Sequence, residues 1–109
     1  WCFEAPDDDT WHGRRARING ILPWGDGYAA YFDGGRSWYD MFEEQCGIAW
    51  SDDGRRFERI HTEEPWLRSP HGCVRYVQPC ASPHGTFIYY EYTDADGGHE
   101  LRVHRLPDA

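Results

Sequence analysis

Charged and aromatic residues gather in four segments of the chain, at 11–19, 33–44, 69–75 and 91–100. Saccharide hydroxyls require converging hydrogen-bond donors and acceptors, which arginine, amide, carboxylate and imidazole groups supply together. The apolar faces of sugar rings stack on aromatic side chains. We therefore expect a carbohydrate ligand, contacted by Arg17, Asn19, Asp33, Arg36, Trp38 (or its neighbour Tyr39), Glu43, Glu44, His71, Arg75 and Glu91.

Glycoside hydrolysis itself would require two carboxylates, about 5–5.5 Å apart for retention or about 6.5–9.5 Å apart for inversion of configuration. Asp33 and Glu91 occupy equivalent places in two similar stretches, which makes them the candidates for such a pair. A structural interpretation competes with this one. Arg17 and Arg75 could pair with these carboxylates and hold neighbouring units together.

Other chemistry finds less support in the sequence. His71 lies in a Pro-His-Gly stretch that is typical of a turn, and the glutamates at 43–44 could belong to a solvated loop. His99 and His104 lack metal-ligand spacing to each other, and the acidic run at 7–9 lacks the glycine and terminal glutamate of a calcium-binding loop. Serine-nucleophile, phosphate-binding and dinucleotide-binding motifs are also missing. The sequence therefore predicts neither a metal site nor a cofactor.

The charge balance argues against two classes of partner. The formal net charge is −8, and all basic residues are arginines. An acidic chain attracts neither nucleic-acid phosphates nor anionic lipid headgroups, so we expect no nucleic-acid or membrane partner. The absence of lysine is consistent with a GC-rich or salt-adapted genome, and also with arginine forks at a ligand site.

Four cysteines lie far apart and form no CxxC pair, which makes a zinc ribbon or a thioredoxin-like motif improbable. One disulfide is possible in an oxidising compartment, although buried free thiols are favoured for Cys2, Cys46, Cys73 and Cys80. No apolar run approaches ~18 residues, and no signal peptide is visible, which favours a cytoplasmic location without establishing it. Because the chain opens with Trp1 and not with Met, we expect a preceding segment to be missing.

The composition favours strands over helices. Six Trp, seven Tyr and five Phe suit a sheet, while 12 Gly and 7 Pro require frequent turns. Turns are predicted at 23–27, at 52–54 with the Asp-Gly signature of a two-residue hairpin, and at 79–85. Strands are predicted at 16–22, 28–33, 47–51, 56–60, 73–77, 86–92 and 100–105.

The second half of the chain repeats the first. Residues 31–33 align with 89–91 and Gly27 aligns with Gly85, at an offset of 58 residues. A period of about fifty residues with four short strands is typical of a propeller blade, although an antiparallel meander also contains similar hairpins. In a blade, the loop into the first strand and the loop after the second strand lie at the same end. The four charged segments are therefore predicted to cluster, with the turn residues at the opposite end.

Six motifs follow one another in order: ARINGIL at 16–22, YFDGGR at 31–36, FEEQCGIA at 42–49, SPHG with Arg75-Tyr76 at 69–76, YYE at 89–91 and GGHELR at 97–102. Together they resemble the C-terminal part of five-bladed β-propeller proteins related to glycoside hydrolase families 43 and 32. The resemblance covers residues 11–106. Cys46 departs from the family pattern, which usually has a small or hydroxyl residue before the glycine.

The resemblance implies an all-β partial propeller of two antiparallel four-stranded blades. Residues 1–15 would end a preceding blade or lead in, 16–68 would form one blade, and 69–109 the last. It also implies that the catalytic acid and base lie in earlier blades, which this sequence does not contain. We therefore expect part of a glycoside hydrolase-like propeller that contributes carbohydrate-contacting residues to an axial pocket.

Two alternatives remain open. The chain could be a stand-alone two-blade module that binds carbohydrate or oligomerises to close a propeller, without catalysis. It could also be a non-catalytic remnant that binds sugar. The partners expected besides carbohydrate are accordingly either the remaining propeller blades or further copies of the chain.

Overall fold

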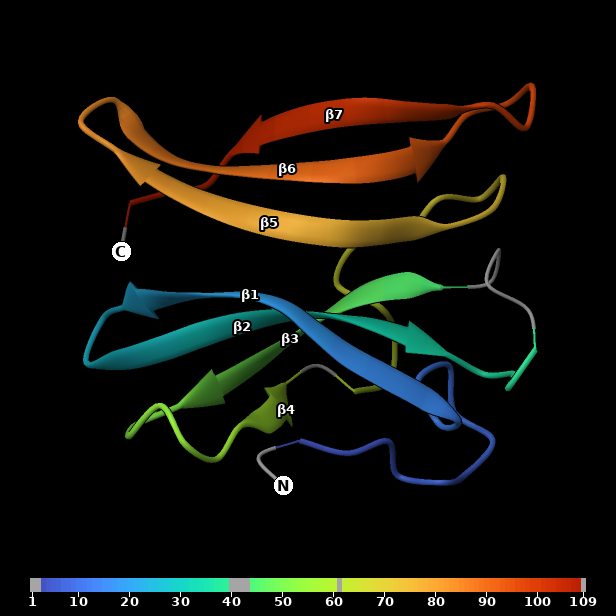
Figure 1. Ribbon diagram of the computed structural model, residues 1–109, viewed down its shortest axis with the longest axis horizontal. Coiled ribbons are helices and arrows are strands. Elements are labelled where there is room, and N and C mark those ends of the chain that lie inside the picture. Colours follow the sequence, from blue (N-terminus) through green and yellow to red (C-terminus); the bar gives the residue numbers. More distant parts are fainter. Residues whose placement is uncertain (1–2, 40–43, 61, 109) are drawn as a thin grey trace.

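The computed structural model describes residues 3–39, 44–60 and 62–108, which form two antiparallel β-sheets (Figure 1). Sheet 1 has the strand order β1-β2-β3-β4 and sheet 2 the order β5-β6-β7. The expected all-β class is confirmed. No helix in the described ranges is long and apolar enough to cross a membrane. The strands are β1 (Arg15–Trp24), β2 (Gly27–Gly35), β3 (Gln45–Ser51), β4 (Glu58–Ile60), β5 (Val74–Ser82), β6 (Gly85–Thr93) and β7 (His99–Arg105).

Sheet 2 has three strands where four were predicted. Among the described residues, no strand pairs with the outer edge of β7. The chain leaves the sheet at Leu106, which is buried, and continues into Pro107. A proline cannot donate the hydrogen bond that a further paired strand would require.

The two hairpin turns are shorter than predicted, because Pro23 and Pro79 lie within strands. Only residues 25–26 and 83–84 connect the paired strands. A proline is tolerated on an edge strand, where its missing N–H group need not meet a partner. Both β1 and β5 are edge strands, so the prolines do not interrupt either ladder.

The connection from β3 to β4 is longer than the predicted two-residue hairpin. Ser51 Oγ accepts the backbone N–H groups of Asp53 at 3.3 Å and Gly54 at 2.9 Å. Asp53 Oδ1 then accepts the next two backbone N–H groups. These side-chain acceptors hold 52–57 as a loop, and the strand resumes only at Glu58.

The two hairpins repeat one register. Arg17 lies opposite Asp33 in the β1–β2 pair, and Arg75 lies opposite Glu91 in the β5–β6 pair, 58 residues later in the chain. In each hairpin the first strand is bulged soon after its arginine. Residues that are 58 apart in the sequence therefore hold equivalent positions in the two hairpins. The assignment of either sheet as a propeller blade stays a prediction.

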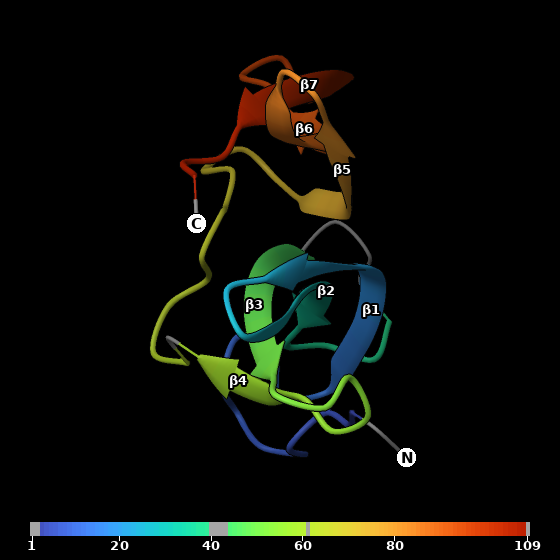
Figure 2. The ribbon, with the colours of Figure 1, turned by 90° about the vertical axis from the view of Figure 1, so that its left-hand side faces the viewer.

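Sheet 2 stacks on sheet 1 (Figure 2). In the core, Ala29 and Tyr31 of β2 pack with Ile88 and Tyr90 of β6. The offset of 58 residues makes Tyr31 of β2 equivalent to Tyr89 of β6, yet it is the neighbouring Tyr90 that belongs to the shared core. The side of β2 that faces the core is therefore the opposite of the side that β6 turns to it. Tyr31 is consequently 3% exposed, whereas Tyr89, on the outer side of sheet 2, is 41% exposed.

The other side of sheet 1 is covered by the N-terminal segment. Phe32 packs with Ala30, Phe3 and Trp11 in a second core cluster. The Trp11 ring stacks on Phe32 with centroids 5.7 Å apart, and the Phe3 ring lies 4.9 Å from it. Sheet 1 is therefore packed on both sides.

Candidate functional site

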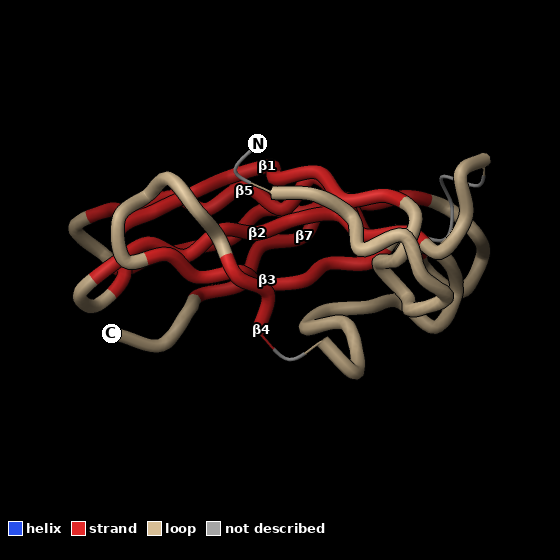
Figure 3. The backbone as a smooth tube through the Cα atoms, turned by 90° about the horizontal axis from the view of Figure 1, so that it is seen from below, coloured by secondary structure: helices blue, strands red, loops and turns tan. Residues whose placement is uncertain are grey.

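The loops that follow β2 and β6 lie at one end of the two sheets, and the hairpin turns lie at the other (Figure 3). At the loop end, ion pairs connect five of the residues expected to contact a ligand: Arg17, Asp33, Glu44, Arg75 and Glu91. The structure thus brings these side chains together. Their role as ligand contacts stays a prediction.

Asp33 is buried and fully engaged by its neighbours. Its Oδ2 atom accepts a hydrogen bond from Arg17 Nη2 at 2.6 Å, and its Oδ1 accepts from Asn19 Nδ2 at 2.6 Å and from the backbone N–H of Tyr76 at 3.1 Å. Burial raises the pKa of Asp33, and these donors offset only part of that effect. Because Tyr76 belongs to sheet 2, Asp33 links the two sheets.

Tyr76 was not anticipated as a site residue. Its φ of +59° places it in the left-handed region, which a bulky side chain rarely adopts, and it lies in the β5 bulge. The Arg17 and Arg75 guanidinium carbons lie 5.0 and 4.9 Å from the centroid of its ring. The bulge therefore aims a backbone N–H at Asp33 and places the Tyr76 ring within cation–π distance of two arginines.

Glu44 lies between the two arginine–carboxylate pairs. It is buried, with its carboxylate oxygens 3.8 Å from Arg15, 3.6 Å from Arg17 and 3.7 Å from Arg75. Burial raises the pKa of Glu44 and the neighbouring Asp33 charge adds to this, while the three arginines lower it. Arg75 belongs to sheet 2, so Glu44 is a second link between the sheets.

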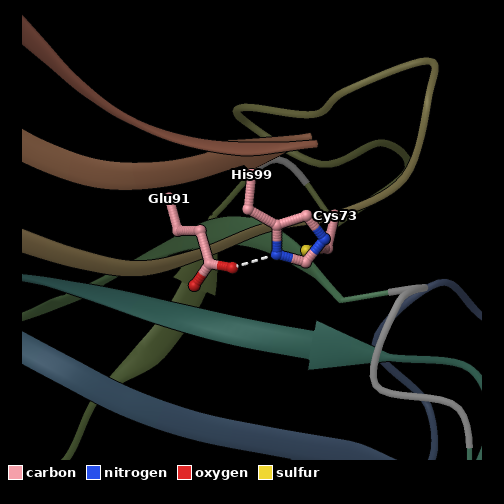
Figure 4. A group of neighbouring side chains, drawn as sticks. All are labelled: Cys73, Glu91 and His99. Carbon is pink, nitrogen blue, oxygen red and sulfur yellow. Dashed lines mark hydrogen bonds and ion pairs between the residues drawn. The ribbon is translucent and has the colours of Figure 1, made fainter. Parts of the chain in front are cut away.

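The pair in sheet 2 is more open. Arg75 donates from Nε and Nη2 to the two carboxylate oxygens of Glu91, each at 3.1 Å, and Glu91 also contacts His99 Nδ1 (Figure 4). The Arg75 hydrogen bonds hold the pKa of Glu91 below its usual range. An ionised Glu91 accepts hydrogen bonds but has no proton to donate, so it does not suit the general-acid role.

An open pocket of about 630 Å³ adjoins these charges. Its lining includes the charged residues Arg17, Asp33 and Glu44 and two aromatic residues, Phe3 and Trp38. Trp38 is 61% exposed, so its indole is available for stacking. The pocket thus combines charged hydrogen-bonding groups with an aromatic surface.

Of the other predicted residues, those in the described ranges lie outside the lining of this pocket: Asn19, Arg36, His71, Arg75 and Glu91. Arg36 is exposed and lines a different hollow, together with Trp11. His71 is exposed in a turn, where its backbone N–H donates to Ser69 Oγ at 3.1 Å, as its alternative interpretation proposed. Glu43 lies outside the described residues.

Three further polar residues at this end were not predicted. Arg15 reaches Glu44, and Cys73 and His99 approach Glu91. Arg15 opens β1 and could have been inferred from the strand start. The approach of Cys73 to His99 depends on strand register and had no signal in the local sequence.

Three of the four cysteines fall in the described ranges, and Cys2 lies outside them. Cys46 and Cys73 are buried free thiols, as expected, whereas Cys80 is a free thiol that is exposed. Burial raises the pKa of the Cys46 thiol well above its usual value. Cys46 therefore packs as an inert core residue.

Comparisons of the chain with protein-family models, curated proteins and solved structures find no match.

Proposed function

We propose that this chain is a two-blade wedge of a glycoside hydrolase-like β-propeller and that it contributes carbohydrate-contacting residues to an axial pocket. The observation that carries the proposal is the repeated arginine–carboxylate pair, whose first copy, Arg17–Asp33, lines an open pocket together with an exposed tryptophan. The two hairpins share one strand register, and unlike sides of the two sheets pack against each other, which also supports the proposal. Heterologous packing of this kind forms a closed ring when the rotation per unit closes.

The burial of each group suggests its part in the pocket. Asp33 and Glu44 are too enclosed to reach a sugar, and both contact Arg17 Nη2, at 2.6 and 3.6 Å. They position that guanidinium, whose side chain is 48% exposed. Arg17 then donates to sugar hydroxyls, and Trp38 stacks on the ring. The acid and base of any hydrolysis belong to other blades.

Binding is tested on an array of immobilised neutral oligosaccharides, followed by titration of the best-bound sugar against tryptophan fluorescence. Trp38→Ala should weaken binding by about five-fold, because one aromatic contact contributes roughly 1 kcal/mol. Trp50→Ala is the matched control, since Trp50 is also partly exposed but lies outside the pocket lining. Equal losses in both variants, or no bound sugar at all, would contradict the proposed pocket.

Catalysis is tested separately on aryl glycosides. The purified chain should show no turnover. Turnover abolished by both Asp33→Asn and Glu91→Gln would show that this chain carries its own catalytic pair.

The alternative, a module that self-assembles into a ring, finds one supporting observation. The outer side of sheet 2 exposes Tyr89 and, on β7, Leu101 and Val103. However, a second copy would have to dock there with the side of sheet 1 that Phe3 and Trp11 already cover. We therefore favour further blades as the partner.

Sedimentation equilibrium distinguishes the two partners. A wedge without its neighbouring blades should stay monomeric or associate without a fixed stoichiometry. A single discrete oligomer would favour the self-assembling module.

A further inference from the structure

Three potential metal ligands converge at the loop end of sheet 2. Cys73 directly precedes β5, Glu91 lies near the end of β6, and His99 opens β7. One ligand atom of each residue lies within 4.8 Å of the ligand atoms of the other two (Figure 4). This is the one such group of three among the described residues, and the proposed carbohydrate pocket does not use Cys73 or His99.

The register of sheet 2 accounts for the convergence. His99 lies opposite Thr93, and the Thr93 backbone N–H donates to the Cys73 carbonyl at 3.0 Å. Cys73, Thr93 and His99 thus form one row across three neighbouring strands. Glu91 lies two residues from Thr93, and side chains two apart on a strand point to the same face.

We propose that Cys73, Glu91 and His99 bind a zinc ion through sulfur, oxygen and nitrogen. Thiolate and imidazole are ligands that Zn²⁺ prefers, and carboxylates complete many of its sites. Three protein ligands leave the fourth tetrahedral position open to water or to a ligand of the protein. The set of ligand atoms, with one sulfur and one nitrogen, also differs from that of calcium sites, whose ligands are all oxygens.

The surrounding groups suit this assignment. Thr93 Oγ1 accepts the backbone N–H of Cys73 at 3.0 Å, so its own hydroxyl proton can be donated to Cys73 Sγ, which lies 3.4 Å away. Arg75 Nε holds Oε2 of Glu91 at 3.1 Å and orients the carboxylate. Outer partners of this kind fix the orientation of metal ligands.

Binding requires only local movement. Zn–ligand bonds of about 2.0–2.3 Å place the ligand atoms of a tetrahedral site about 3.3–3.6 Å apart. Cys73 must approach slightly, and the contact between Glu91 and His99 must open to admit the ion. The Glu91 and His99 side chains are 23% and 26% exposed, so the ion has a path from solvent to the buried sulfur.

The test is a titration of the metal-free chain with Co²⁺, whose bond to a thiolate produces a charge-transfer absorption band. The chain should bind one Co²⁺ with this band, and added Zn²⁺ should abolish it. Cys73→Ser should lose the band, and His99→Ala should weaken binding by at least about ten-fold. Cys80→Ser removes a free thiol that lies outside the group and should bind as the unmodified chain does.

Circular dichroism and a thermal-shift measurement separate binding from misfolding. His99 is on the exposed edge strand, so His99→Ala should keep the β-sheet spectrum and lose the rise in melting temperature that Zn²⁺ gives the unmodified chain. A band that survives Cys73→Ser, a band lost in Cys80→Ser, or the absence of any zinc-dependent rise would each overturn the proposal. Sugar binding enters none of these measurements.

Discussion

Replacing Asp33 with asparagine tests whether this carboxylate joins the two sheets. Asparagine keeps the shape and retains one oxygen, which can still accept from Asn19 and from the Tyr76 N–H. Its amide nitrogen, however, replaces the oxygen that accepts from Arg17 Nη2. Two donors then face each other inside the junction, and one hydrogen bond of an ion pair is lost.

The expected loss of stability follows from the burial of the two partners. A hydrogen bond to a charged group contributes about 1.5–3 kcal/mol, and removing one partner of a buried ion pair costs about 3–5 kcal/mol. Arg17 is 48% exposed and regains water, and neutralising Asp33 removes a carboxylate whose pKa burial raises. We therefore expect about 2 kcal/mol, which is roughly an 8–16 °C fall in melting temperature for a chain of this size.

Glu91→Gln is the matched control, because Glu91 holds the equivalent register position in sheet 2. Its partners Arg75 and His99 both belong to that sheet, and its side chain is 23% exposed. An ion pair that solvent reaches contributes about 1 kcal/mol or less, so Glu91→Gln should have the smaller effect. Among the described residues, Glu91 accepts no hydrogen bond from the neighbouring sheet.

Urea unfolding followed by tryptophan fluorescence measures both variants, at neutral pH and with a chelator present so that no metal contributes. The slope of free energy against urea should be the same in the two variants. A loss for Glu91→Gln as large as that for Asp33→Asn would refute the reasoning. It would mean that the contact with Tyr76 adds nothing to the pairing within one sheet.

Two further substitutions test the core and the sheet junction. Burial raises the pKa of Tyr31 to about 12, so the stability that its protonated phenol provides is complete below its usual pKa of 10.0 and is lost as the pH rises through about 12. Tyr31→Phe should remove about 2–3 kcal/mol of this alkaline loss in urea unfolding at rising pH, and Tyr89→Phe, at the exposed equivalent position, is its control. Gly20→Ala should destabilise by about 1–3 kcal/mol, because a Cβ there would overlap the Pro79 ring of the neighbouring sheet. Gly98→Ala, whose Cβ would meet only the Asp94 carboxylate at 3.3 Å, should stay within about 0.5 kcal/mol, and equal losses at both glycines would contradict the close approach of β1 and β5.

The strands and their pairing could be predicted because their signals are local. Aromatic and small residues alternate with turn residues, and the offset of 58 that aligns Asp33 with Glu91 also separates Arg17 from Arg75. The exact turns could not be predicted. Whether Pro79 ends a strand or lies within it depends on whether that strand is at the edge of its sheet, and this is decided by the fold.

The candidate site was predicted only in part, because its connections run between sheets. Arg17 and Asp33 belong to one hairpin and could be paired from their spacing. The N–H of Tyr76 reaches Asp33 only because Tyr76 adopts a positive φ, which no sequence pattern for a tyrosine predicts. Cys73 and His99 meet through a strand that lies between them in the sheet.

The two sheets differ most on the side that carries Asp33 in sheet 1 and Glu91 in sheet 2, because sheet 2 covers this side of sheet 1 and nothing among the described residues covers it in sheet 2. Asp33 receives a backbone N–H from sheet 2, and Tyr31 beside it is buried by the same sheet. Glu91 and Tyr89 hold the equivalent places, yet Tyr89 is 41% exposed. If a further blade packs on sheet 2 as sheet 2 packs on sheet 1, it must bury Tyr89 and bring a backbone donor to Glu91. The exposed pair therefore defines the geometry that any partner blade has to satisfy.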